Sequence, residues 1–175
     1  MQDNEILKTI KERVSVRKFK PEMVSREEID KILEAGVWSA SGMNSQSPLF
    51  IAITDKETRD KLSAMNAAVM NFDQDPFYGA PVVIAVLSDK NAHTYIYDGS
   101  IAIGNMMLAS YSMGIGCCWI HRAKEEFESE EGKEILKSLG IEGEYEGIGH
   151  LILGYPEGDA PAVKERKEGR VYYID

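Results

Sequence analysis

AHTYIYDGSIAIGNMMLASYSM, residues 92–113, is the longest helical pattern in the chain. Small residues interrupt its Met, Ile and Leu throughout: Gly99, Ala102, Gly104, Ala109 and Ser110. Since the distance between two packed helices depends on the side chains at the contact, this pattern predicts a helix lying close against another helix. Gly114 and Gly116 end it, and the apolar run CCWIH at 117–121 follows directly.

Short apolar runs lie on both sides of this segment. Residues 49–54, 81–87 and 147–154 have the length and composition of buried strands. Residues 171–174, VYYI, predict a short terminal strand that needs another sheet edge to join. The charged, proline-containing stretch between the last two runs has no hydrophobic face of its own.

The remaining periodic segments are predicted to be helices. Asp3 opens a helix over 3–13, with Ile6, Leu7, Ile10 and Val14 as its apolar stripe. Further helices are expected from Ser25, where Ser25 and Glu28 have capping-box spacing, from Asp55, and as one amphipathic helix over 124–139. Helices come first and strands separated by helices follow, so the fold class is α+β or mixed α/β.

The composition indicates one globular domain spanning residues 1–175. With 43% hydrophobic and 28% charged residues, the chain is typical of a soluble protein, and neither a secretory leader nor a membrane span is expected. The two cysteines are adjacent and cannot join distant segments, which favours a reducing, cytoplasmic setting. A formal net charge of -9 argues against nucleic acid as a partner.

Against this acidic background, RVSVRKFK at 13–20 concentrates four cations in eight positions. In an extended segment Arg13, Ser15 and Arg17 share one face, and two guanidinium groups beside a hydroxyl suit a phosphate and its attached polyol. The alternative is a solvated helix end, where cations meet the negative end of the helix dipole. Lys164 and Arg166 repeat the cationic alternation in the C-terminal tail, and a shared anion would give that tail a reason to be ordered.

Two further groups of polar residues have both an ordinary and a functional interpretation. The loop that contains Ser41, Met43, Asn44 and Gln46 is either a connection whose side chains cap local backbone or a hydrogen-bonding rim for a planar heterocycle. Cys117, Cys118 and His121 invite a zinc interpretation, but adjacent cysteines fit poorly on one tetrahedral metal, so no metal is predicted. No nucleophile–His–carboxylate set stands out, and Gly114-Ile115-Gly116 lacks the context of a dinucleotide loop.

Taken together, these motifs resemble the FMN-dependent nitroreductase family. The resemblance covers nearly the whole chain in the expected order, through R-x-S-x-R-x-F (13–19), S-G-M-N-x-Q (41–46), A-P-V-V-I (80–84), D-x-x-x-A-x-x-N-M-x-L-A (98–109), G-I-G-x-x-W-I (114–120), L-G-Y-P (153–156) and K-x-R (164–166). It implies an α+β nitroreductase-like fold, with a central mixed or antiparallel sheet flanked by helices. It also implies a homodimer in which the arm 157–175 reaches the partner subunit.

The same resemblance implies a set of FMN-binding residues. The phosphate-binding cations of the family correspond to Arg13, Lys164 and Arg166. The segment that binds the phosphate and ribityl chain also includes Val14 and Ser15, and Arg17 falls near the pyrimidine edge of the flavin. Ser41, Met43, Asn44 and Gln46 match the loop contributed by the partner, while Trp119, Ile120 and His121 match the segment along the isoalloxazine, where a backbone N–H can reach N5. Asn66 is a further candidate for the pyrimidine edge.

The implied activity is that of an FMN oxidoreductase. NADH or NADPH reduces the flavin and leaves, and a nitroaromatic, quinone or similar small acceptor then takes the electrons by double displacement, with no catalytic side chain required. Two departures stand out: Ser47-Pro48 replaces the usual Pro-Trp, and no helical insertion follows Leu87. We therefore expect an open flavin face, partly roofed by Phe72, Phe77 and Tyr78. The alternatives are a flavin-binding sensor, a specialised chemistry such as flavin fragmentation or reductive dehalogenation, and a phosphate-binding regulatory module without flavin.

Overall fold

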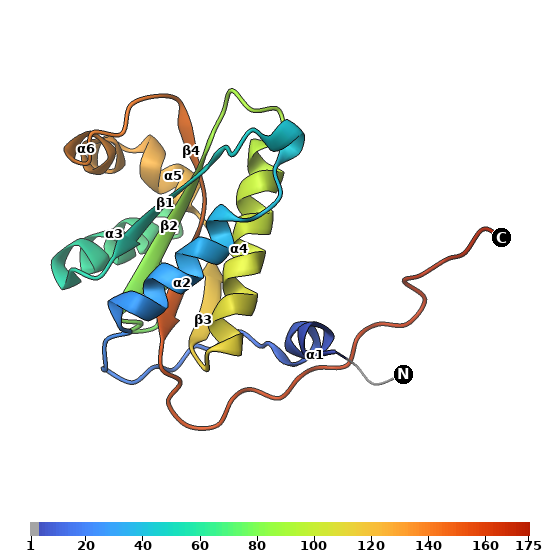
Figure 1. The fold of residues 1–175 in the computed structure, drawn as a ribbon. Coiled ribbons are helices and arrows are strands. Elements are labelled where there is room, and N and C mark those ends of the chain that lie inside the picture. Colours follow the sequence, from blue (N-terminus) through green and yellow to red (C-terminus); the bar gives the residue numbers. More distant parts are fainter. Residues whose placement is uncertain (1–3) are drawn as a thin grey trace.

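The computed structural model describes residues 4–175 as a four-stranded antiparallel sheet with helices on both faces (Figure 1). The strands are β1 (Pro48–Ile53), β2 (Val82–Asp89), β3 (Gly116–Ile120) and β4 (Tyr145–Gly154), in the order β1-β2-β4-β3. The helices are α1 (Glu5–Glu12), α2 (Arg26–Val37), η1 (Gly42–Asn44), α3 (Lys56–Val69), α4 (Tyr95–Ser112), α5 (Ala123–Glu128) and α6 (Glu130–Ser138). The predicted α+β class is confirmed.

Each face of the sheet carries its own hydrophobic core. Helices α2 and α4 cover one face, with Ile32 and Met106 packed against Val86 and Leu151. Helices α3, α5 and α6 cover the other, where Leu62 of α3 and Phe127 of α5 pack against the sheet. The strands β2 and β4 are buried on both faces, which is why their sequences are apolar almost without interruption.

Helix α4 packs against a second helix as predicted, but the close contact is made by a glycine of α2 and not by the small residues of α4. Helix α2 approaches α4 at Gly36, where an added Cβ would lie 3.0 Å from Met106 Sδ. Gly99 serves the sheet instead, because a Cβ there would lie 2.6 Å from Cγ1 of Ile148 on β4. The central helix is therefore fixed between a second helix and the sheet.

The structure corrects several predicted boundaries. The single helix expected over 124–139 is two helices, because Ser129 is extended (φ -70°, ψ 162°) and its Oγ accepts from Gly132 N–H to start α6. Asn4 caps α1, and Val14 lies beyond its end. The predicted cap Asp3 lies outside the described residues. Ser25 with its capping box and Asp55 cap α2 and α3 as predicted.

The C-terminal arm, residues 157–175, runs away from the body as an exposed extended segment (Figure 1). The strand predicted at 171–174 is not formed, since these residues pair with no strand in the described chain. Tyr172 and Ile174 are 87% and 102% exposed. Within residues 4–175, no helix is both long and apolar enough to cross a membrane.

Candidate functional site

The cation-rich segment 13–20 lies along the outer edge of β3. Val16 N–H donates to Cys117 O at 2.9 Å, and Val16 itself is buried against Gly116. A Cβ on Gly116 would lie 3.0 Å from Val16 Cβ, so the glycine permits this close approach. Because Val16 points into the core, the extended backbone directs the odd-numbered residues away from it.

Arg13 is the least satisfied side chain of this segment. Its Nη1 is buried and has no hydrogen-bond partner within the described residues. A buried donor without a partner costs about 1–3 kcal/mol, and a charged one costs more. The guanidinium is therefore built to receive an acceptor that this chain does not itself supply.

Arg17 separates two cavities near the β3 edge. One, of about 370 Å³, is lined by Ser15, Arg17 and Tyr78 together with residues 156–161 at the start of the arm. The other, of about 300 Å³, has Arg17 and Tyr78 on one side. The guanidinium carbon of Arg17 lies 5.7 Å from the centroid of the Tyr78 ring, a cation–π arrangement that links the two walls.

The 300 Å³ cavity, which we call the β3 cavity, is aromatic and cationic. It is lined by Arg17, Met70, Phe72, Pro76, Tyr78, Cys118, Trp119, Ile120, His121 and Arg122. No carboxylate is among these residues, although the chain as a whole carries a net charge of -9. The combination suits a planar ring system with negative character.

The expected roof over this cavity is only partly present. Phe72 and Tyr78 line it and are about half exposed. Phe77, by contrast, is fully buried in the core of the α3 face, where its ring meets the His150 ring edge-on at 5.2 Å between centroids. Phe77 therefore stabilises the fold and does not cover the cavity.

The structure also redirects Asn66, which was a candidate for direct ligand contact. Its side chain is fully buried on α3. Nδ2 donates to His121 O and to Glu126 Oε2, both at 2.8 Å, and Oδ1 accepts two bonds from Arg122. With its amide occupied in this way beneath the surface, Asn66 has no group free to meet a ligand in this structure.

The polar loop at 41–46 is held by Asp98 of α4. The carboxylate accepts from Gly42 N–H at 3.0 Å and from the hydroxyls of Ser45, Ser47 and Thr94. Burial alone would raise the pKa of Asp98, but these hydrogen bonds outweigh burial and hold it below its ordinary value.

The same loop presents candidate residues outward. Met43, Asn44 and Gln46 are exposed and all have positive φ, between 51° and 56°. Within one chain, however, the loop lies at the first turn of α4, whereas the segment 13–20 lies beside β3, which follows the last turn (Figure 1). An 18-residue helix spans about 27 Å. A single chain therefore does not bring the two groups of predicted residues together.

The tail cations are likewise not assembled with the rest. Lys164 and Arg166 lie on the exposed arm, beyond the residues that line the 370 Å³ cavity. Residues 4–175 also hold no group of three or more His, Cys, Asp or Glu side chains that could bind a metal ion.

Sequence reasoning missed two features of this region. Arg122 lines the β3 cavity directly after the predicted 119–121 segment, and its position next to His121 was the available signal. The pair Glu126 and His150 lies buried beneath it, with Nε2 and Oε2 2.5 Å apart. Nothing in the sequence connects these two residues, since they are 24 positions apart and belong to different elements.

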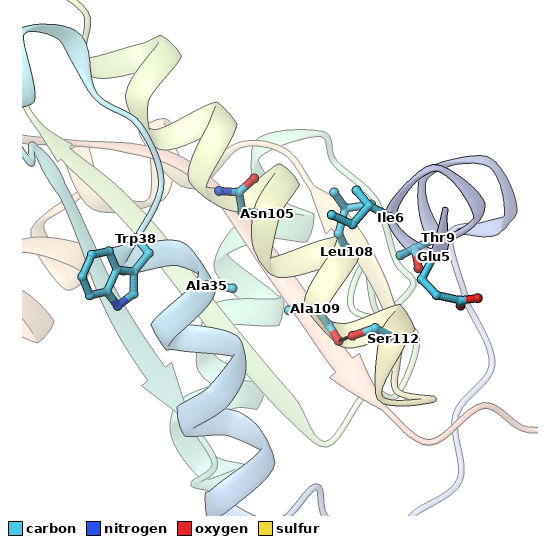
Figure 2. A pocket seen from close by; sticks show the side chains of 9 residues that line it. All are labelled: Glu5, Ile6, Thr9, Ala35, Trp38, Asn105, Leu108, Ala109 and Ser112. Atoms are coloured by element: carbon cyan, nitrogen blue, oxygen red, sulfur yellow. Dashed lines mark hydrogen bonds between the residues drawn. The ribbon is translucent and has the colours of Figure 1, made fainter. Parts of the chain in front are cut away.

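A larger apolar groove lies elsewhere, between α1, α2 and α4 (Figure 2). Its volume is about 490 Å³, and Ile6, Trp38 and Leu108 line it. Trp38 is 81% exposed and Ile6 68% exposed, so this face of the chain leaves large apolar side chains uncovered.

Comparison with known proteins places this geometry in context. The family model described as "Nitroreductase family" matches residues 10–76 and 64–155. A protein of Archaeoglobus fulgidus, provisionally named NADH dehydrogenase/NAD(P)H nitroreductase, is 32% identical over 158 residues, which cover 87% of this chain and 86% of that one. An FMN reductase (NAD(P)H) of Bacillus subtilis is 26% identical over 180 residues, covering 93% and 70%. A Bacteroides fragilis nitroreductase crystallised with bound FMN is similar in structure, with a TM-score of 0.90 and 28% identity over 99% of this chain and 100% of that one.

Proposed function

The chain belongs to the nitroreductase family, as its motifs predicted, and from this premise we propose that it transfers electrons from NADH or NADPH, by way of FMN, to a small aromatic acceptor. It is an NAD(P)H-dependent flavin oxidoreductase with a nitroreductase-like fold. The observation that carries the assignment to this chain's own residues is the buried, unpartnered Arg13 Nη1 on the same segment as Ser15 and Arg17, which line the cavities of the β3 edge.

The residues at this edge fit FMN in kind and in order. Arg13 offers an unused guanidinium donor for the phosphate, and Ser15 offers a hydroxyl on the same extended segment. Arg17 stands at the entrance of the aromatic β3 cavity, where a cation suits the pyrimidine edge. Val14, between the two phosphate-side residues, contributes backbone and is half-buried.

The chemistry that bound FMN would supply is redox chemistry: hydride is taken from the nicotinamide and electrons are passed to the acceptor. The protein's part is to bind, orient and tune. Cys117 O accepts from Val16 N–H at the outer edge of β3, and backbone groups along a strand point alternately to its two edges. Trp119 N–H therefore points to the same outer edge and can donate to a bound flavin. No acid or base side chain is needed in the cavity.

The site is completed by a second copy of the chain in this proposal. The loop residues Ser41, Met43, Asn44 and Gln46 and the arm with Lys164 and Arg166 come from the partner subunit. Two observations support this arrangement: the loop lies at the opposite end of α4 from Arg13, and residues 157–175 are exposed along their whole length. The uncovered apolar face around Trp38 offers area for such a dimer (Figure 2).

Binding of FMN by purified protein tests the assignment of Arg13. Arg13→Met should weaken FMN binding about 10- to 150-fold, the equivalent of losing a charged hydrogen bond worth 1.5–3 kcal/mol. Lys20→Met, which removes an exposed cation from the same segment, is the matched control and should bind normally. Fluorescence titration with FMN measures both. Equal affinity of Arg13→Met and the native protein would contradict the phosphate assignment, and native protein that binds no FMN would contradict the function itself.

The order of substrates provides a second test. One open cavity must serve the reductant and the acceptor in turn, because the chain passes from β2 to α4 without an inserted segment that could build another site. Initial rates with NADH or NADPH and a nitroaromatic or quinone should give parallel double-reciprocal lines. Intersecting lines would indicate that both substrates are bound together.

A further inference from the structure

A buried polar network underlies the β3 cavity and has no part in the function proposed so far. It runs from His150 on β4 through Glu126 on α5 to Asn66 on α3, and it ends at Arg122 in the cavity wall. His150, Glu126 and Asn66 are each at most 1% exposed. Polar groups at this depth are costly unless they are paired, so a network of three in one core requires a reason.

Hydrogen-bonding chemistry fixes the orientation of the Asn66 amide within this network. A guanidinium can only donate, so Oδ1 must face Arg122, whose Nε and Nη2 lie 3.0 and 2.8 Å away. The His121 carbonyl can only accept, so Nδ2 must face it, and the same Nδ2 reaches Glu126 Oε2. Glu126 Oε2 in turn lies 2.5 Å from His150 Nε2. Asn66 thereby holds both the side chain of Arg122 and the backbone before it.

The backbone conformation of Arg122 requires support from neighbouring groups, and the hydrogen bonds of Asn66 provide it. Arg122 has φ 78° and ψ 9°, a left-handed conformation that is uncommon for a residue with a side chain. Such a conformation costs about 1–3 kcal/mol and persists only where the surroundings enforce it. The turn enables the chain to leave β3 at Ile120 and start α5 at Ala123 while the Arg122 side chain stays in the cavity wall.

Arg122 places a second positive charge in the wall of the β3 cavity. It lines the same cavity as Arg17, no carboxylate lines that cavity, and the nearest negative charge of the network, Glu126, is separated from the guanidinium by the Asn66 amide. A second fixed cation there would favour added negative charge on a bound ring. The motif that pointed to Arg17 does not include Arg122.

From these contacts we infer that Arg122 is a second cation acting on bound FMN, and that Asn66 is its positioning residue, supported by the buried Glu126–His150 pair. The inference rests on the proposed FMN function and adds a residue that tunes the reduction potential. Asn66 acts through Arg122 and does not touch the cofactor.

A redox titration of the FMN-loaded protein tests the pair. Arg122→Met should lower the ratio of reduced to oxidised FMN about tenfold at a fixed potential, which is a shift of about -30 mV for a two-electron couple. Asn66→Leu should give a similar shift, because the guanidinium is released from its place. The double variant should show no further shift, since both changes remove the same interaction. Lys20→Met, remote from the network, should leave the potential unchanged.

The alternatives give different results. If Arg122 only stabilises the turn, Arg122→Met lowers the melting temperature without moving the potential, and the inference is wrong. If Asn66 acts on FMN independently, the two shifts add, and its positioning role is wrong. Should Asn66→Leu fail to fold, Asn66→Ala takes its place in the cycle, and the Arg122→Met potential alone still decides the role of the cation. Protein that binds no FMN at all would instead refute the proposed function, so the two failures are distinguishable.

Discussion

Gly149 on β4 leaves the space that the Trp119 indole occupies, and replacing this glycine with alanine should lower the stability of the fold for that reason. A Cβ at this position would lie 2.1 Å from Trp119 Nε1 and 2.9 Å from Cδ1. Restoring an ordinary separation of about 3.5 Å requires the indole or the strand to move by about 1.4 Å. Trp119 is partly exposed, so the indole should move before the buried strand does.

The magnitude follows from that displacement. Overpacking of this kind costs about 1–3 kcal/mol, and for a chain of this length each kcal/mol lowers the melting temperature by about 2–4 °C. Trp119 also lies on the strand that borders the β3 cavity, so FMN should be retained less well. Gly149→Ala is therefore expected to lower both thermal stability and FMN affinity.

A double-mutant cycle checks this reasoning directly. Trp119→Ala removes the colliding ring, so adding Gly149→Ala in that background should cost almost nothing in the free energy of unfolding measured with urea. The coupling between the two positions should then equal the whole overpacking cost. If Gly149→Ala destabilises both backgrounds equally, the collision with Trp119 is not the cause, and the argument from geometry fails.

Three further outcomes are expected. Asp98→Asn should reduce the loss of unfolding free energy at acidic pH. The lowered pKa of Asp98 stabilises the native state above the unfolded pKa of about 3.9, and this stabilisation is lost as the pH falls towards the folded pKa. Urea unfolding at several pH values should show that the variant loses a slope of at most about 1.4 kcal/mol per pH unit. Ser25→Ala should cost about 1 kcal/mol of unfolding free energy by removing the cap and capping box of α2. Ser138→Ala, an exposed change at the C-terminal end of α6, should cost little, and thermal melts of both variants measure the difference. Ending the chain at Tyr155 should reduce FMN retention and weaken the proposed dimer, as measured by flavin absorbance and sizing chromatography. A truncated protein that stayed dimeric and kept its FMN would show that the arm cations are only solvated charge.

The sequence predicted those elements whose signals are local. The capping residues Ser25 and Asp55 begin their helices as expected, because a cap and its hydrogen-bond partner lie within three residues of each other. The apolar runs became β1, β2 and β4, and in β2 and β4 burial on both faces demands such runs. The break at Ser129 was missed, since 124–139 is amphipathic throughout and the deciding contact, Gly132 against the Glu126 carbonyl, involves a close backbone approach that periodicity does not reveal.

The site was predictable only in part. Arg13, Ser15 and Arg17 share a short segment, and the structure places all three at the β3 edge. The surroundings of Asn66 could not be predicted, because its burial depends on Glu126 and Arg122, which are 60 and 56 positions away. Phe77 resembled its neighbour Tyr78 in sequence, yet one side chain enters the core and the other stays outside. The strand predicted at 171–174 is not formed, and these residues pair with no strand within the described chain.

The adjacent cysteines of β3 lie in different cores, so their reactivity reports separately on the opening of each face of the sheet. Since neighbouring strand residues face opposite sides, Cys117 belongs to the core under α2 and α4, and Cys118 to the core under α3 and α5. Both are 2% exposed, and burial raises the pKa of Cys117 to about 12, so neither should react with a thiol reagent while the fold is closed. Their rates of labelling by a thiol reagent therefore measure how often each side of the sheet opens, without an engineered cysteine.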